Sequence, residues 1–339
     1  MDVKVNKSGL LIYDFDYETY NIGDYIQSIA ARQYFQSIDQ FVNRETLNSY
    51  DGPPIKVIMN GWFLHNIENW PPSDNIFPLF ISFHLNFSAI KILDKIQNIQ
   101  YFKKYEPIGC RDYYTLELLK SKGIRAYFSG CLTLTLGKSY YNEVDNGEIL
   151  FVDILPKILS ITRSKNAVKQ FYKDRKLIKI LELIYTHWKN RKKVLRRNLI
   201  INSIFEKDIL KYKREIFHDF YDNDSHDNRF NKAENLLSLY SKARIVFTSK
   251  IHCALPCLAM GTPVVFIKGP DLNNEIDACR LEGVLEFLNV IEVDSSNNIS
   301  INYAEKFSKI DLNFKITNRE DVSYFVKKFN DIINEYLRK

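Results

Sequence analysis

The stretch from residue 244 to residue 267 constrains the fold of this chain more than any other. It reads as a buried apolar strand, a polar turn, a short helix that stops at Gly261 and a second buried apolar strand. This order is typical of a βαβ unit, whose turn lies at the carboxyl edge of a parallel sheet. Open α/β folds bind their ligands at that edge. The pattern therefore predicts an α/β protein with a ligand site near residue 250.

The polar turn of this unit carries groups that suit an anion. We expect Thr248 and Ser249 to cap the helix and its first backbone N–H groups to remain available as donors. The ammonium of Lys250 and the imidazole of His252 follow directly. The turn thus predicts a pocket that holds a negatively charged substrate beside a proton donor, although a histidine in a first helical turn also occurs as a structural residue.

The length of 339 residues favours two domains. Apolar runs predict strands at 10–15, 55–59 and 78–84, with an amphipathic helix after Asn21 and another over 113–121. A second set begins with a strand at 148–153 and includes a further strand at 198–203. We therefore expect two Rossmann-like α/β domains facing across a cleft, a GT-B-like plan. The predicted ranges are 1–140, 147–318 and a helical tail at 319–339 that packs back across both domains.

Bulk properties exclude several protein classes. No run approaches the roughly 18 apolar residues of a spanning helix, and the amino terminus shows no apolar export segment, so we expect a cytoplasmic protein. The five cysteines are odd in number and lie mostly among apolar residues, which argues against a disulfide framework. The i, i+4 spacing of Cys253 and Cys257 would suit a metal. Without a second Cys/His pair, we interpret both as core residues and predict no metal site.

The positive charge of the chain is concentrated in one segment. Residues 163–197 contain 13 Lys and Arg against 2 Asp and Glu, whereas the whole chain has a net charge of +6. This segment is either a solvated helix face or a peripheral contact with the anionic inner face of the plasma membrane. No stacking or groove-reading motif accompanies the charge, so we predict no nucleic-acid binding.

Three segments, in this order, resemble one known family. Asn21-Ile-Gly-Asp24 before a helix is similar to its Asn-x-Gly-Asp turn, and Arg111 before a helix that ends at Gly123 is similar to its second motif. Ser249-Lys-Ile-His252, continued by Gly261-Thr-Pro263, resembles its Ser-Arg-x-His and Gly-x-Pro signature. The family is the polysaccharide pyruvyltransferases, and the resemblance spans roughly residues 10 to 268.

The resemblance implies both a fold and an activity. Members resemble two-domain GT-B glycosyltransferases and transfer the pyruvyl group of phosphoenolpyruvate to a sugar, usually as a ketal, in bacterial capsule or other surface polysaccharide synthesis. The amino-terminal domain would then hold the sugar, and the cleft would hold phosphoenolpyruvate. This chain departs from the family where Lys250 replaces an arginine, which forfeits bidentate pairing with an anion. It also has Ser129-Gly-Cys where the family often shows an Asp-Pro pair.

Phosphoenolpyruvate requires cations at two ends and a proton donor near its methylene carbon. We expect Arg111 and Lys250 to bind its anionic groups, helped by the turn from Thr248 to Ser249, and His252 to be the acid. For Arg111, an ion pair with Asp112 or Glu117 is the structural alternative. No cofactor or metal is needed for this reaction.

We expect the sugar acceptor, on a polyprenyl-diphosphate or nucleotide carrier, to contact residues of the first domain. The candidates are Asn21, Gly23, Asp24, Asn60 and His84, with Asp24 as a hydrogen-bond acceptor or base. The structural alternative at the first turn is an ordinary glycine and cap before a helix.

Two other functions remain open at this point. One is a glycosyltransferase that uses a nucleotide sugar, with the polar residues 270–277 binding a ribose, since fold alone does not set chemistry. The other is a silent scaffold of a polysaccharide assembly complex, which the lysine at position 250 favours.

Overall fold

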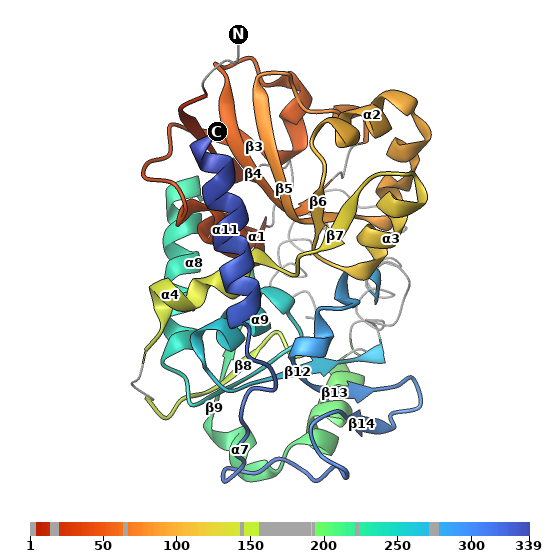
Figure 1. Ribbon diagram of the computed structural model, residues 1–339. Helices are drawn as coiled ribbons and strands as arrows, with labels where there is room; N and C mark the ends of the chain where they lie inside the picture. Colours follow the sequence, from red (N-terminus) through yellow and green to blue (C-terminus); the bar gives the residue numbers. More distant parts are fainter. Residues whose placement is uncertain are drawn as a thin grey trace, which may run out of the picture.

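The computed structural model describes residues 5–13, 20–63, 67–142, 146–155, 191, 194–220, 224–270 and 278–339. Two six-stranded sheets form its framework, one in each half of the molecule (Figure 1). Helices cover both sheets, so the predicted two-domain α/β class with facing Rossmann-like sheets is confirmed.

The first sheet is parallel throughout. Its strands at 55–63 and 76–85 are buried along most of their length, as expected where helices cover both faces of a parallel sheet. In spatial order they are β3 (Gln40–Asn43), β1 (Lys7–Ile12), β4 (Ile55–Phe63), β5 (Ile76–Leu85), β6 (Ile108–Cys110) and β7 (Ala126–Phe128).

The second sheet is parallel except for one edge strand, which runs antiparallel to its neighbour. Its order is β14 (Ile299–Ile301), β13 (Asn289–Val293), β12 (Val264–Lys268), β11 (Ile245–Thr248), β8 (Ile149–Val152) and β9 (Lys213–Ile216). The βαβ unit predicted over 244–267 is confirmed as β11, α9 (Ile251–Met260) and β12. The helix ends at Gly261, whose φ of 78° is in the left-handed region.

Four helical segments lie between the two sheets and share one hydrophobic core, which contains buried residues of both halves. They are α1 (Ile22–Arg32), η4 (Leu132–Leu136), α8 (His226–Ser241) and α9. The two outer faces of the sheets have cores of their own. A short antiparallel pair, β2 (Tyr20–Asn21) with β10 (Asp219–Phe220), also joins the halves.

The last helix, α11 (Ser323–Arg338), runs along the molecule from the second sheet to the first, so the carboxyl terminus lies near β3 and β4 (Figure 1). Tyr34 donates to Asn330 at 2.9 Å, and Lys56 donates to the carbonyl of Leu337 at 2.9 Å. Both bonds fix the helix to the amino-terminal half.

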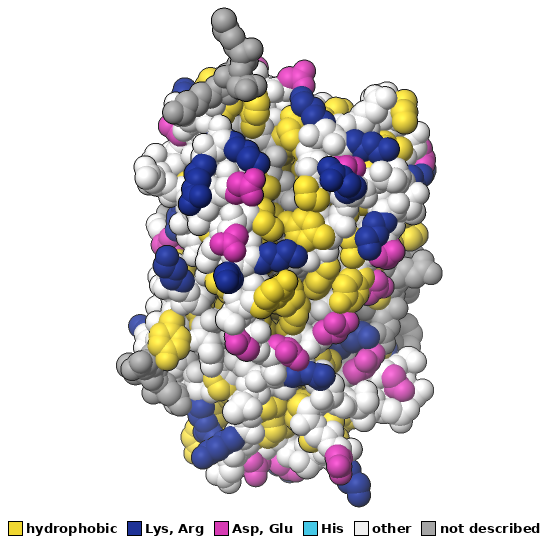
Figure 2. All heavy atoms as spheres, in the orientation of Figure 1, with side chains coloured by type: hydrophobic (Ala, Val, Ile, Leu, Met, Phe, Trp, Pro, Cys, Tyr) yellow, Lys and Arg dark blue, Asp and Glu magenta, His cyan; other side chains and the backbone are white. Residues whose placement is uncertain are grey.

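The other labelled helices and 3-10 turns lie between consecutive strands along the chain. They are α2 (Ile96–Lys104), α3 (Tyr113–Ser121), α4 (Gly137–Tyr140) and α7 (Lys207–Tyr212), with 3-10 turns η1 (Arg44–Ser49), η2 (Ile67–Asn69), η3 (Phe87–Asp94), η6 (Cys279–Leu281) and η7 (Leu285–Phe287). On the face shown in Figure 2, basic and acidic side chains are interspersed, and apolar side chains gather along the middle. Among the described residues drawn in this view, the basic side chains form no extended patch.

One predicted strand is wrong. Residues 194–204 are helical, where the apolar run at 198–203 had favoured a strand. Ile200, Ile201, Ile204 and Phe205 are buried against the second sheet. These four residues have the spacing of one face of a helix. The three consecutive apolar residues Leu199, Ile200 and Ile201 make that period hard to recognise in the sequence.

Candidate active site

The turn before α9 uses its two hydroxyls within the protein. Thr248 Oγ1 accepts from the N–H of Lys250 at 3.0 Å. Ser249 Oγ donates to the carbonyl of Ile267 at 2.6 Å and accepts from the N–H of Leu155 at 3.0 Å. The helix has Lys250 at its N-cap and no side-chain cap, so the predicted capping by Thr248 and Ser249 is wrong. Both residues shape the turn, and their contact with a substrate stays a prediction.

His252 lies in the first turn of α9, half-buried, at the junction of the two halves. Its Nε2 is buried and has no hydrogen-bond partner among the described residues. Burial lowers its pKa well below the usual value, and its interactions with Arg111, His218, Arg280 and Lys250 lower it further. His252 thus sits in a cationic environment that an anion would compensate.

Arg111 follows β6 of the first domain and is almost completely buried, with 1% of its surface exposed. Its Nε lies 3.6 Å from Asp112 Oδ2, so the predicted alternative ion pair is present, yet Nε makes no hydrogen bond among the described residues. The same guanidinium acts on the pKa of His252 in the other domain. The structure therefore brings these two predicted residues into one electrostatic environment.

Lys250 reaches the site from the second domain. Its Nζ lies 3.9 Å from Asp153 Oδ2, which also accepts from the N–H of His218 at 2.8 Å. His218 is fully buried with its Nε2 2.7 Å from the hydroxyl of Tyr240. Burial, reinforced by the charge of Lys250, lowers the pKa of His218 to about 3. Lys250 thus contributes positive charge next to both histidines.

The first turn of α1 meets α9 directly. Asn21 caps α1 by accepting from the N–H of Gly23 at 2.9 Å. A Cβ added to Gly23 would lie 3.2 Å from Nδ1 of His252, so glycine permits this close approach. The predicted Asn-x-Gly-Asp turn and the predicted Ser-Lys-x-His turn therefore lie against each other.

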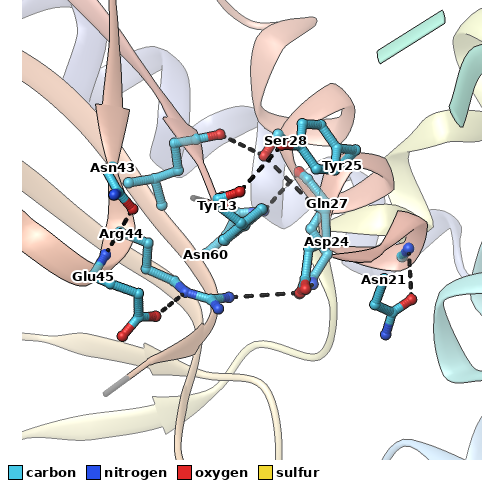
Figure 3. A network of polar contacts seen from close by, with 12 residues as sticks. Tyr13, Asn21, Asp24, Tyr25, Gln27, Ser28, Asn43, Arg44, Glu45 and Asn60 are labelled. Atoms are coloured by element: carbon cyan, nitrogen blue, oxygen red, sulfur yellow. Dashed lines mark hydrogen bonds and ion pairs between the residues drawn. The ribbon is translucent and has the colours of Figure 1, made fainter. Parts of the chain in front are cut away.

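Asp24 belongs to a polar network at the start of α1 (Figure 3). Its Oδ1 lies 3.6 Å from Arg44, whose Nε also contacts Glu45 Oε1 at 2.7 Å. Gln27 donates to the same carboxylate at 3.2 Å. Burial raises the pKa of Asp24, and Arg44 and then Arg111 oppose that rise. A carboxylate whose pKa is raised by burial is a suitable acceptor for a proton from a hydroxyl group.

Asn60 and His84 extend the site along β4 and β5. Asn60 is buried and donates through Nδ2 to the carbonyl of Gln27 at 2.9 Å, while its Oδ1 has no partner among the described residues. His84 is fully buried, and its Nδ1 lies 2.6 Å from Asp112 Oδ2. Both residues lie in the carboxyl-terminal halves of their strands, where the sequence had led us to expect polar side chains that face the cleft.

Sequence reasoning missed two arginines. Arg280, in η6, lowers the pKa of both His252 and His84. Arg44, in η1, is buried and stacks 4.0 Å above the ring centroid of Tyr13. Each arginine lies in an irregular segment without a motif, and only the neighbouring Asn43, which caps η1 as Asn21 caps α1, gives a local signal.

The five cysteines and Ser129 lie in the interior of the protein. These described cysteines form no disulfide with one another, and Cys253 and Cys257 belong to the shared core. No group of three or more His, Cys, Asp or Glu side chains in the described ranges is placed to hold a metal ion. Ser129, in place of the family's Asp-Pro pair, accepts from the N–H of Ser82 at 3.0 Å and donates to the carbonyl of Cys110 at 3.0 Å.

Two predictions fall largely outside the described residues. Of the basic segment 163–197, only 191 and 194–197 are described, and of the polar residues 270–277 only Pro270. Arg196 donates to the carbonyl of Ser295 and Arg197 to that of Ile154. No described helix combines the length and apolar character needed to span a membrane.

Comparison with known proteins agrees with these motifs. A family model described as polysaccharide pyruvyl transferase matches residues 21–269, from the cap of α1 to the end of β12. A search of curated proteins finds no match. Among solved structures, the chain is similar to the functional uncharacterized protein KP1_0663 from Klebsiella pneumoniae subsp. pneumoniae NTUH-K2044, with TM-score 0.43, 10% identity, and 80% of this chain and 87% of that chain covered. Because the matched range includes most of the chain and both motif turns, the protein belongs to the polysaccharide pyruvyl transferase family and is a transferase of polysaccharide pyruvylation.

Proposed function

We propose that this protein transfers the pyruvyl group of phosphoenolpyruvate to a sugar as a ketal during synthesis of a bacterial capsule or another surface polysaccharide. The observation that carries the proposal is the cationic surrounding of His252, to which Arg111 contributes from the first domain and Lys250 from the second. Phosphoenolpyruvate has a carboxylate and a phosphate, and both groups require such charges.

Arg111 is the stronger anion-binding candidate. Its guanidinium is almost completely buried and its Nε makes no hydrogen bond among the described residues. A buried donor without a partner costs free energy, and an anionic oxygen would remove that cost. Lys250, 30% of whose side chain is exposed, would provide a second charge with less geometric constraint. The turn from Thr248 to Ser249 would add backbone donors.

His252 would act as the acid only after the substrate has bound. In the unliganded protein its lowered pKa leaves the ring neutral at pH 7. A multiply charged anion would offset the arginine and lysine charges and raise that pKa, because an adjacent opposite charge favours the protonated form. Substrate binding would therefore be coupled to uptake of a proton, which His252 then gives to the methylene carbon.

The acceptor sugar would lie against the first turn of α1, where Asn21, Gly23, Asp24 and Asn60 meet. Asp24 would accept a proton from one hydroxyl, because its carboxylate has a raised pKa and is held by Arg44. A sugar on a polyprenyl-diphosphate carrier would bring further negative charge. The charges that act on His252 suit such a carrier as well as the donor.

Phosphate release tests this function. The purified protein would be incubated with phosphoenolpyruvate and a panel of p-nitrophenyl hexosides, and separately with nucleotide sugars. We expect acceptor-dependent phosphate release and no nucleoside diphosphate release. The variant His252→Ala should lose about 10²–10⁴-fold in turnover, the usual contribution of a positioned acid, while its unfolding transition is retained. Wild-type turnover by His252→Ala would remove His252 from this role.

A further inference from the structure

A buried histidine–carboxylate pair lies beside the candidate active site and has no role in the reaction described so far. His84 Nδ1 lies 2.6 Å from Asp112 Oδ2, and both side chains have no exposed surface. Thr115 Oγ1 lies 3.2 Å from the same Nδ1 and accepts from the N–H of Leu85 at 3.2 Å. The other oxygen of Asp112 accepts from the N–H of Thr115 at 2.9 Å and so caps α3. The pair is fixed from both sides.

These contacts determine which nitrogen of the ring carries the proton. Burial raises the pKa of Asp112, but His84 and Arg111 hold it below its usual value, so the carboxylate is ionised. An ionised carboxylate only accepts, so Nδ1 must be the protonated nitrogen. Burial also lowers the pKa of His84, with Asp112 opposing and Arg111 and Arg280 reinforcing this, so the ring is neutral near pH 7. Its Nε2 then carries a lone pair.

That lone pair is unused. Nε2 of His84 is buried and has no hydrogen-bond partner among the described residues. Native proteins satisfy nearly all buried polar atoms, so an exception of this kind requires a ligand, a water or a function. The neighbours of the ring point to function, because the charges of Arg111 and Arg280 act on both His84 and His252. Arg111 also acts on Asp24.

We propose that Nε2 of His84 takes the proton from one of the two acceptor hydroxyls, and that Asp112 is a positioning residue that holds the ring in the required tautomer. This inference rests on the proposed function, because a ketal needs two hydroxyls whereas Asp24 serves only one.

The protons and bonds balance in this scheme. Each attacking hydroxyl oxygen forms a C–O bond to the former enol carbon and loses its proton to Asp24 or to His84. His252 adds one proton to the methylene carbon, which becomes a methyl group. The C–O bond to phosphate breaks, and the second proton leaves with hydrogen phosphate. The two hydroxyl protons thus end on the methyl carbon and on the released phosphate, so no oxidant or reductant is required.

Two variants test the assignment. His84→Gln removes the base, and we expect kcat to fall by about 100-fold or more. Asp112→Asn keeps an oxygen that can cap α3 but permits the wrong tautomer, a change that costs about 10⁴-fold in a serine protease triad. His226→Gln, at the start of α8, and Asp321→Asn, which loses a carboxylate that accepts from the N–H of Ser323 at 2.8 Å, are the matched controls with unchanged kcat.

The pH profile separates this role from a structural one. Since Asp112 raises the pKa of His84, its replacement should move the acidic limb of kcat/KM to lower pH while lowering the plateau. A merely structural pair would change stability and leave the position of that limb unchanged. Phosphoenolpyruvate should still raise the melting temperature of both variants, because Arg111 and Lys250 remain.

Nitrogen NMR on histidine-labelled wild-type protein gives a test that does not depend on folding of the variants. We expect the His84 ring to show a protonated Nδ1 and an unprotonated Nε2. The opposite tautomer, or wild-type kcat and an unmoved pH profile in Asp112→Asn, would overturn the assignment. Failure of the wild-type protein to use or bind phosphoenolpyruvate would instead contradict the proposed function, and this inference with it.

Discussion

Gly23 and His252 lie in contact across the junction of the two domains. A Cβ atom on Gly23 would lie 3.2 Å from both Cβ and Nδ1 of His252, and 3.1 Å from Oδ1 of Asn21. Two turns that are separated by more than two hundred residues in the chain therefore form one site. The imidazole of His252 can occupy its position because residue 23 is a glycine and has no side chain there.

Gly23→Ala should lower activity without unfolding the protein. The new methyl group must displace the His252 ring or the Asn21 cap, so we expect kcat to fall about tenfold or more. Alanine favours a helix over glycine by about 1 kcal/mol. Weakening the cap costs a similar amount. Urea unfolding should therefore show little change in the free energy of unfolding, and a large loss of stability with normal kcat would contradict the contact.

Lys250→Met should weaken binding of phosphoenolpyruvate. Loss of a hydrogen bond to a charged group costs about 1.5–3 kcal/mol, or roughly 10–100-fold in KM. Lys250→Arg restores a forked donor and should bind at least as well as the wild type. Lys120→Met is the control, because Lys120 is a half-exposed lysine that pairs with Glu117 on α3 at 3.2 Å. An unchanged KM in Lys250→Met would exclude Lys250 from the donor site.

Arg44→Met should affect both stability and pH dependence. Arg44 is buried between Asp24 and Glu45, and removal of one partner from a buried ionic cluster costs about 3–5 kcal/mol. Arg44 also lowers the pKa of Asp24, so its loss should raise that pKa and shift the acidic limb of activity to higher pH. Urea unfolding and a pH–rate profile measure the two effects.

The exposed Arg125 gives a control for that variant. It pairs with Glu106 at 2.6 Å, but 76% of its side chain is accessible. Arg125→Met should therefore cost less than about 1 kcal/mol. An equal loss of unfolding free energy in Arg44→Met and Arg125→Met would show that the buried Arg44 cluster stabilises the protein no more than an ordinary surface ion pair does.

His218 should make the protein less stable in acid. Its pKa falls to about 3 on folding, from an ordinary value near 6.5. Between these values the unfolded chain binds the extra proton, so stability decreases as the pH falls below about 6.5. The loss reaches about 2 kcal/mol at pH 5. The variant His218→Asn should have a shallower slope of unfolding free energy between pH 5 and 6.5, and an identical slope would contradict burial of a neutral ring.

The sequence predicts the central unit well because its signals are local. β11, α9 and β12 follow from two apolar runs with a polar turn and Gly261 between them. Tyr113–Ser121 is found as predicted because helical spacing and Gly123 mark its extent. Residues 198–203 are part of a helix rather than the predicted strand, because three consecutive apolar residues carry no clear period.

The parts of the site that depend on tertiary packing could not be predicted. Arg44 and Arg280 lie in 3-10 turns, and although Asn43 marks the start of one of these turns, no local pattern shows that the arginine charges act on Asp24 and His252. The hydroxyls of Thr248 and Ser249 suggested a cap, but contacts with neighbouring segments use them instead. The sequence does not indicate the partner of His84, because Asp112 lies 28 residues further along the chain, at the N-cap of α3.

Calorimetric titration of phosphoenolpyruvate at pH 7 tests the central claim most directly. Experiments in buffers of different ionisation enthalpy give the number of protons taken up on binding. The account predicts that the wild-type protein binds and takes up more protons than His252→Gln, because the anion raises the pKa of His252 within the cationic pocket. Absence of binding, or the same proton uptake in both proteins, would contradict it.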